Sequence, residues 1–253
     1  LSQETLKIIA CVTMLIDHIG AAVLARLLMV NGLGELDQTN ADAIMQWLSA
    51  NGALYWTYTI MRMIGRVAFP IFCFLLVEGF LHTHDVKKYA MRLGLFALLS
   101  EIPFDLAFSS KILEFNYQNV FFTLFIGLLT MIAYRAVEEK EEWNQALKVI
   151  LYILIVAAGM ALAYFLKTDY AEKGVFCIMV LYIFRKKKMW QIIAGCASFI
   201  WETPALFGFI PIAFYNGTRG WKMKYFFYIF YPAHLLILYL LCYFMGISGY
   251  SAV

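Results

Sequence analysis

Long apolar runs constrain the fold of this chain more than any other feature. They lie near residues 6–30, 56–81, 89–108, 119–136, 147–166, 171–184 and 225–244. Most of them approach the ~20 residues that a helix needs to cross about 30 Å of hydrocarbon, where backbone polar groups must be satisfied within the segment. With 63% hydrophobic and 15% charged residues, the chain predicts an all-α polytopic membrane protein in which residues 1–253 form a single transmembrane domain.

The segment from residue 189 to residue 216 does not fit this pattern. It has basic clusters near both ends and is too short for two full crossings. Its centre, WETPALFG, contains Glu202 and Pro204, which predict two short helices or a re-entrant hairpin. Such broken backbone is tolerated in a membrane only where protein or a wet cavity satisfies it. We therefore expect about nine transmembrane or half-membrane helices around a polar intramembrane cavity.

Basic residues predict the orientation of the chain. Most of the 20 Lys and Arg residues lie on one set of alternate connections, and the positive-inside rule makes that side cytoplasmic. The amino terminus falls on the same side, so we expect a multi-pass cell-membrane protein with a cytoplasmic amino terminus. The loop 31–53 has no Lys or Arg, which fits the outside, and its residues 41–51 fit a short interfacial helix. The predicted cytoplasmic residues are Lys7, Lys87, Lys88, Arg92, Arg135, Lys140, Lys148, Arg185, Lys186, Lys187, Lys188, Arg219, Lys222 and Lys224.

Two ionisable residues interrupt the first apolar run near its middle, namely Asp17 and His18. A charge near the bilayer centre costs roughly 2.5–3.5 kcal/mol, so such residues usually face a cavity or a partner. An adjacent carboxylate can orient an imidazole for general-base chemistry. Neighbouring helix positions point about 100° apart, however, so Asp17 has Arg62 or Arg66 as alternative partners. Spacing alone leaves both interpretations open.

The next two spans carry charged pairs four residues apart. Arg62 and Arg66 share a helical face in RMIGRVAFP, and Glu101 and Asp105 share one in SEIPFD. Antiparallel packing of these spans would bring Arg66 to the depth of Glu101 or Asp105, so we predict an Arg–carboxylate contact there. Two guanidinium groups exceed what one such contact needs, and they suit a phosphate or an oxyanion.

Further polar residues extend the candidate site. His234 lies within the last span, and Glu78 ends the second span beside Lys87 and Lys88. These lysines and Arg92 fit either an ordinary interfacial boundary or a basic entrance for a phosphorylated ligand from the cytosol. The five cysteines show no metal-ligand spacing, so no metal is expected.

Strings of residues over most of the chain carry a resemblance to a known family. They are LKIIACVTMLIDH, RVAFPIFCFLLVEGFLHT, RLGLFALLSEIPFDLAF, NVFFTL, DYAEKGV, YNGTRG and FYPAHLLILYL, in this order. Together they resemble the TraX family, whose namesake acetylates the amino terminus of a conjugative pilin subunit. More distantly, the chain is similar to polytopic acyltransferases that move acetyl groups from coenzyme A across membranes onto glycans.

The resemblance implies acetyl transfer from acetyl-CoA, supplied by the cytosol, to an amine or hydroxyl of a peptide, protein or glycan. His18 matches the early-helix histidine that serves such enzymes as a base, and Asp17 would orient it. Arg62 and Arg66 would contact the acyl donor or the transition state. The candidate donor contacts are Lys87, Lys88 and Arg92. The candidate substrate or oxyanion contacts are Glu78, Glu101, Asp105, Asn119, Thr123, Glu202 and His234. Membrane lipid is the expected surrounding, and no nucleic acid is expected as a partner.

Two other classes of protein fit some of these features. A small-molecule transporter would also bury Arg, Glu and His and break its helices at mid-membrane. No inverted repeat is evident in the sequence, which counts against it. A noncatalytic assembly scaffold would need the charges only for packing, which is hard to reconcile with so many buried ionisable groups.

Overall fold

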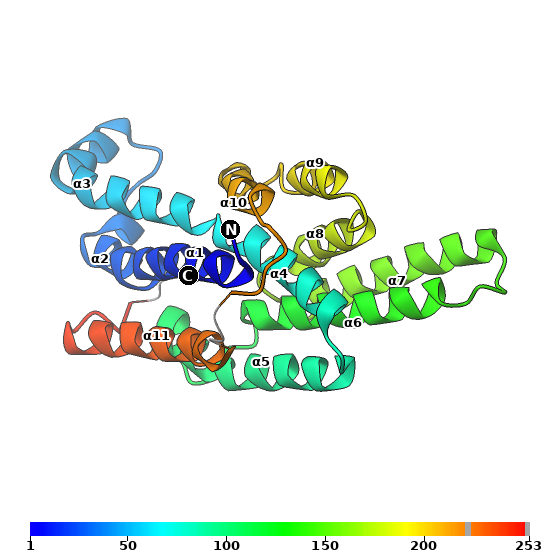
Figure 1. The fold of residues 1–253 in the computed structure, drawn as a ribbon. Helices are drawn as coiled ribbons and strands as arrows, with labels where there is room; N and C mark the ends of the chain where they lie inside the picture. Colours follow the sequence, from blue (N-terminus) through cyan, green and yellow to red (C-terminus); the bar gives the residue numbers. More distant parts are fainter. Residues whose placement is uncertain (221–223, 251–253) are drawn as a thin grey trace.

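Helices make up all the regular elements of the described chain, apart from one bridge between Gln118 and Thr168 (Figure 1). The computed structural model describes residues 1–220 and 224–250, so Lys222 of the predicted cytoplasmic set lies outside the described residues. The elements are α1 (Gln3–Ile19), η1 (Gly20–Leu24, a π-helix), α2 (Ala25–Val30), η2 (Leu33–Glu35), α3 (Ala41–Gly65), α4 (Ala68–His82), α5 (Val86–Ser109), α6 (Val120–Glu138), α7 (Gln145–Phe165), α8 (Ala171–Ile183), α9 (Lys188–Ser198), η3 (Thr203–Gly208), α10 (Phe209–Ala213) and α11 (Lys224–Phe244).

Polar side chains set the start of several helices. Ser2, Asn40, Asp85, Asn119 and Asn144 each accept a hydrogen bond from a backbone N–H in the first turn of the helix that follows. Such caps satisfy donors that the helix itself leaves unpaired and typically contribute about 1 kcal/mol. The apolar residues after each cap then form the long helices that the sequence predicts.

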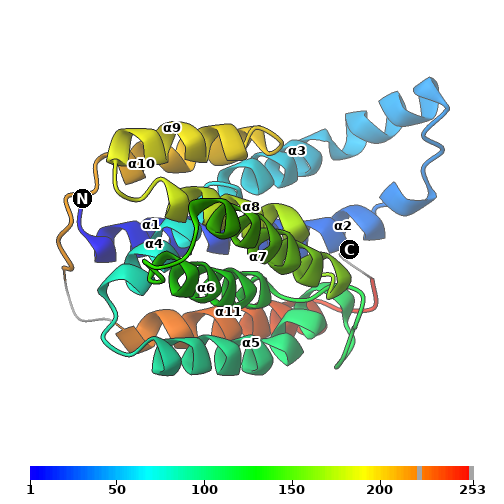
Figure 2. The ribbon, with the colours of Figure 1, turned by 90° about the vertical axis from the view of Figure 1, so that its right-hand side faces the viewer.

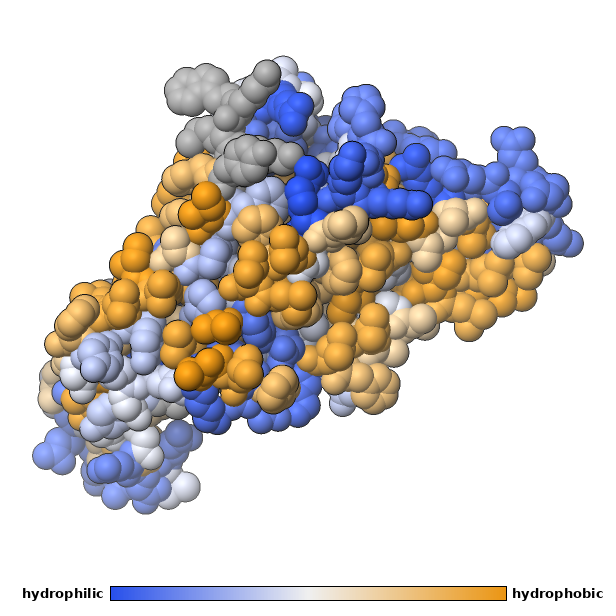
Figure 3. Space-filling view, turned by 90° about the horizontal axis from the view of Figure 1, so that it is seen from below, coloured by the Kyte–Doolittle hydropathy of each residue, from blue (hydrophilic) through white to orange (hydrophobic). Residues whose placement is uncertain are grey.

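Among the residues that the structure describes, four helical stretches are long and apolar enough to cross a membrane, namely Gln3–Val30, Ala41–His82, Val120–Glu138 and Gln145–Phe165. In α7 only 11% of the most apolar stretch is buried against the rest of the protein, so its apolar side chains face outward as in a membrane-spanning helix. The face seen in Figure 3 carries a broad apolar band with hydrophilic residues gathered at opposite edges. Length, composition and surface therefore agree on a membrane protein.

The prediction for residues 41–81 was wrong in two respects. Residues 41–51 form no separate interfacial helix but the first part of α3, which projects beyond the bundle (Figures 1 and 2). The predicted span 56–81 is also two helices, with a break at Arg66 and Val67. Pro70 explains the break, because a proline ring clashes with the carbonyl four residues earlier, which here belongs to Arg66.

The segment 189–216 forms two short helical parts, α9 and the continuous η3–α10, in agreement with the predicted pair of short helices. Gly208 of η3 lies so close to Pro70 and the Val67 carbonyl that a Cβ would not fit. The hairpin thus packs directly on the α3–α4 break.

Helix α1 lies in the middle of the helical bundle, where it packs on α3, α4 and α11 (Figure 2). Helix α11 packs on α5, and α6 packs on α5, α7 and α8. The residues of α1 near position 17 are therefore surrounded by helices from distant parts of the sequence.

Candidate functional site

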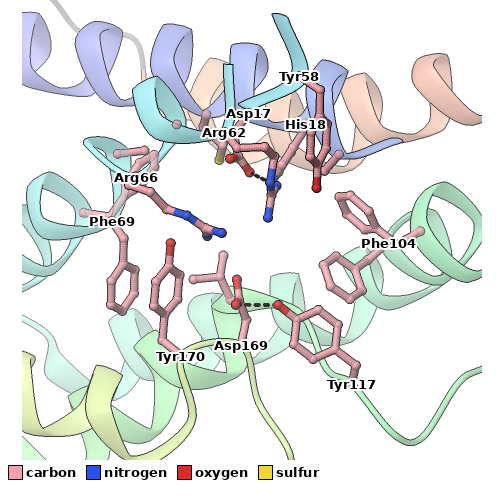
Figure 4. Close-up of a pocket in the computed structure, with 17 residues that line it drawn as sticks. Asp17, His18, Tyr58, Arg62, Arg66, Phe69, Phe104, Tyr117, Asp169 and Tyr170 are labelled. Atoms are coloured by element: carbon pink, nitrogen blue, oxygen red, sulfur yellow. Dashed lines mark hydrogen bonds and ion pairs between the residues drawn. The ribbon is translucent and has the colours of Figure 1, made fainter. Parts of the chain in front are cut away.

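A cavity of about 100 Å³ lies between α1, α3, α4 and α5, which is room for several water molecules or a small acyl group. The connections around residues 117–120 and 169–170 complete its walls (Figure 4). Its lining residues are Met14, Asp17, His18, Ala21, Tyr58, Arg62, Gly65, Arg66, Ala68, Phe69, Phe72, Phe104, Phe108, Tyr117, Val120, Asp169 and Tyr170. All four residues predicted as catalytic, Asp17, His18, Arg62 and Arg66, line this one cavity.

Asp17 pairs with Arg62 rather than with His18. Arg62 Nη1 donates to Asp17 Oδ2 at 2.8 Å, across the contact between α1 and α3. The second oxygen, Oδ1, is buried without a hydrogen-bond partner. Gly65 permits this approach, because a Cβ at that position would overlap the Asp17 side chain. The structure thereby decides between the two partners that spacing left open for Asp17.

Arg66 does not contact Glu101 or Asp105, so that prediction was wrong. Its Nε lies 3.6 Å from Glu202 Oε1, and its guanidinium group faces Tyr170 (Figure 4). The pairing assumed one straight helix across residues 56–81, whereas the α3–α4 break places Arg66 beside the η3 hairpin. Glu202, a predicted substrate contact, lies beside Arg66 and does not line the cavity.

The carboxylates of α5 have other partners. Glu101 accepts hydrogen bonds from the Asn119 backbone and side chain, and Asp105 accepts from the Glu114 backbone N–H at 2.8 Å. Asn119 also donates to the Ala97 carbonyl and caps α6. These residues connect α5 with the start of α6 and do not line the cavity.

His18 forms a chain of contacts with α11. Its Nδ1 lies 2.7 Å from Nε2 of His234, and Nδ1 of His234 lies 2.7 Å from the Phe230 carbonyl oxygen. Phe108 and Tyr231 pack edge-on against the His18 ring. His234 itself is 5% exposed and does not line the cavity. It therefore lies behind His18 as seen from the cavity.

The opposite wall contains residues that sequence reasoning missed. The Tyr117 hydroxyl donates to Asp169 Oδ1 at 2.6 Å (Figure 4). The single bridge aligns the two connections, because Gln118 N–H donates to the Lys167 carbonyl and Asp169 N–H to the Gln118 carbonyl. The string DYAEKGV contains Asp169 and Tyr170 and was the only signal for them.

The Asp169 loop is held in a strained conformation. Tyr170 and Ala171 have φ values of +63° and +41°, which costs a non-glycine residue of order 1 kcal/mol. Tyr170 stacks on Phe69, and the Thr123 hydroxyl donates to the Asp169 carbonyl. Thr123, a predicted oxyanion contact, thus supports this loop from behind.

The predicted donor contacts lie apart from the cavity. Lys88 pairs with Asp85 at 3.1 Å, and Glu78 lies 3.9 Å from His82 at the end of α4. Lys87 and Arg92 begin α5, and none of these residues lines the cavity. Any contact they make with a donor would be to a part outside the cavity.

The charges around the cavity are mixed. Arg62 and Arg66 face Asp17 and Asp169, with Glu202 behind Arg66. In the connection between α7 and α8, burial raises the pKa of Asp169, while the Tyr117 hydrogen bond and the guanidinium groups act against that rise. Within residues 1–220 and 224–250, no three His, Cys, Asp or Glu side chains are grouped as a metal site requires.

Comparison with known proteins agrees with the resemblance of the sequence strings. The family model described as "TraX protein" matches residues 2–242. The chain is 27% identical over 208 residues to the "Probable fimbrial assembly protein FimC, serogroup H1" of Dichelobacter nodosus, which covers 72% of this chain and 83% of that protein. No solved structure matches the chain. Because the family model spans nearly the whole sequence, including every residue of the cavity, the chain belongs to the TraX family.

Proposed function

We propose that this protein is a multi-pass acetyltransferase of the cell membrane with its amino terminus in the cytoplasm, using acetyl-CoA as the acyl donor. The observation that carries the proposal is the convergence of an imidazole and two guanidinium groups on one small cavity. An acyl transfer needs a base for the accepting amine or hydroxyl and donors for the developing oxyanion. His18 supplies the first, and Arg62 and Arg66 supply the second.

The reaction follows from these roles. The acceptor nitrogen or oxygen attacks the thioester carbonyl while His18 takes its proton, and the negative charge on the carbonyl oxygen develops beside Arg62 or Arg66. Collapse of this intermediate breaks the C–S bond. The proton on His18 then passes to the departing thiolate, so the imidazole returns to its starting state. Asp17 keeps Arg62 oriented through their 2.8 Å ion pair.

The size of the cavity separates the two ends of the donor. About 100 Å³ accommodates an acetyl thioester but not a nucleotide. The phosphates of the donor would therefore lie outside it, and Lys87, Lys88 and Arg92 of α5 are their proposed contacts. The acceptor is an amine or hydroxyl of a peptide, protein or glycan. The description of the relative as a fimbrial assembly protein favours a protein acceptor.

The test is release of coenzyme A from acetyl-CoA by the purified protein in detergent, with a panel of peptides, amines and sugars as acceptors. His18→Ala should lower the rate at least about 100-fold, the contribution typical of a general base, while a cooperative melting transition shows that the variant is still folded. His82→Ala is the matched control, because the His82 side chain is 73% exposed at the end of α4. Full activity in a folded His18→Ala variant, or neither binding nor turnover of acetyl-CoA by the wild type, would refute the proposal.

A further inference from the structure

His234 does not line the cavity, but it contacts His18, which does. It is buried on α11, between the His18 ring on one side and the Phe230 carbonyl on the other. Both contacts are 2.7 Å long, and they use the two nitrogens of one imidazole. A histidine that only filled space would not need both of its nitrogens aligned in this way.

The two histidine rings meet edge to edge. Their planes lie within 7° of parallel and their centroids are 5.0 Å apart, although the nearest nitrogens are only 2.7 Å apart. Parallel rings stacked face to face cannot approach to 2.7 Å, so the two rings lie in nearly one plane. In this arrangement the N–H of one ring points at the lone pair of the other, as a hydrogen bond requires.

The Phe230 carbonyl fixes which nitrogens carry protons. A carbonyl oxygen only accepts hydrogen bonds, so His234 carries its proton on Nδ1. In neutral His234, Nε2 is then a lone pair, and the hydrogen between the rings must belong to Nδ1 of His18. We infer that His234 is a positioning residue that holds His18 in the tautomer with Nε2 unprotonated and available to the cavity. This inference rests on the proposed function.

The surroundings favour a neutral pair of rings. The positively charged groups facing His18 are Arg62 of α3 and Arg66 at the α3–α4 break. The two carboxylates of the cavity already have partners, since Asp17 is paired with Arg62 and Asp169 accepts from the Tyr117 hydroxyl. Around His234 lie Phe230 and Tyr231, and no carboxylate contacts it among the described residues. A third or fourth positive charge, on one or both rings, would be repelled by the two guanidinium groups.

The tautomer of His18 determines which of its nitrogens acts as the base in acyl transfer. Nε2 of His18, on the ring edge away from His234, is the atom that takes the proton from the acceptor. The resulting imidazolium keeps its Nδ1–H bond to His234, so the ring does not turn while it is charged. Holding the wrong tautomer would leave an N–H where the base is needed, which in a comparable histidine site lowers the rate by several orders of magnitude.

The first test measures the tautomer directly and needs no substrate. The chain has four histidines, so side-chain nitrogen NMR of protein labelled with ¹⁵N-histidine gives a simple spectrum, and loss of a signal in His18→Gln assigns His18. We expect a protonated Nδ1 and an unprotonated Nε2 in the wild type at neutral pH. A protonated Nε2 on His18 would overturn the inference.

The second test compares two replacements of His234. His234→Gln places an amide oxygen near the position of Nε2 and can still accept from His18, whereas His234→Leu cannot. With melting temperatures confirming that both are folded, we expect kcat for acetyl transfer to fall about 100-fold or more in His234→Leu, with KM for acetyl-CoA changed less than about threefold. His234→Gln should recover at least about tenfold of that loss.

Equal kcat values for the folded Gln and Leu variants, or a His234→Leu variant within about threefold of the wild type, would show that His234 only packs. If the tautomer is as expected but the wild type transfers acetyl to no acceptor, the proposed function has failed and the positioning role falls with it. The two failures are therefore distinguishable, since only the first leaves wild-type activity intact.

Discussion

At the scale of single residues, Asp17 and His18 show how neighbours on a helix serve different partners. Asp17 turns toward α3 and pairs with Arg62, while His18 turns toward α11 and contacts His234. Positions one residue apart on a helix point about 100° apart, which is the angle needed to reach two different helices. The acid and the imidazole are thus adjacent in sequence without forming a dyad.

Two variants of Asp169 distinguish the contribution of its charge to stability from the contribution of its hydrogen bond to Tyr117. Burial raises its pKa, so loss of the charge should cost the fold little, whereas loss of the Tyr117 hydrogen bond should cost about 1–3 kcal/mol. We predict that Asp169→Asn keeps the melting temperature near the wild-type value, because the amide oxygen still accepts from Tyr117. Asp169→Ala should melt several degrees lower. Thermal unfolding in detergent measures both, and equal melting temperatures for the two variants would contradict this account.

At the scale of elements, the contact between α1 and α3 depends on a glycine. A Cβ on Gly65 would overlap Asp17, and the nearest atom it would meet is the Asp17 Cβ, which no change of side-chain rotamer can move. We predict that Gly65→Ala destabilises the protein by about 1–3 kcal/mol, as overpacking does, and lowers acetyl transfer because it displaces Asp17 and with it Arg62.

Gly52 on the same helix provides the control. Nothing lies within 4 Å of a Cβ at that position, so Gly52→Ala gains helix propensity of about 1 kcal/mol without a clash. Its melting temperature should equal or exceed that of the wild type. If both glycine variants shift stability in the same direction, local helix propensity and not the α1–α3 contact governs position 65.

At the scale of the whole molecule, Arg26 joins parts of the chain that are far apart in sequence. Its side chain is fully buried, and its hydrogen bonds reach the carbonyls of Ala22, Ala107 and Tyr250 and the hydroxyl of Ser110. The π-helix η1 contains Ala22. Arg26 therefore ties α2 and η1 to the end of α5 and to Tyr250.

Loss of this side chain should leave several buried acceptors without donors. Because each bond to a charged group contributes about 1.5–3 kcal/mol, we predict that Arg26→Ala lowers the unfolding free energy by at least about 3 kcal/mol. Lys88→Ala is the control, since its pair with Asp85 is exposed and contributes about 0.5 kcal/mol. Denaturation of both in the same detergent gives the comparison, and a similar small effect at the two positions would argue against the structural role of Arg26.

Much of the helical framework could be predicted from the sequence, because apolar runs and polar caps act locally. The spans near 6–30, 119–136 and 147–166 agree closely with the observed helices. To predict the break at Arg66, the effect of Pro70 on the carbonyl one turn earlier has to be taken into account. Without the break, the predicted depth of Arg66 in the membrane was wrong. The π-helix after His18 left no signal in the apolar pattern.

The candidate site was predictable only for residues on helices. Arg62 and Arg66 were placed together by their spacing, and both line the cavity. Tyr117 and Asp169 lie on connections whose positions depend on the bridge between Gln118 and Thr168, a contact between residues 50 positions apart. Spacing within one segment carries no information about such a contact.

The bridge between Gln118 and Thr168 also constrains the loop lengths that members of this family can have. Because the connections 110–119 and 166–170 hold each other in register and form one wall of the cavity, a change in the length of either would misplace Tyr117 and Asp169 together. The connection between α6 and α7 is exposed and remote from the cavity. Inherited insertions and deletions should thus accumulate at residues 139–144, while the two bridged connections keep their lengths and change, when they do, as a pair.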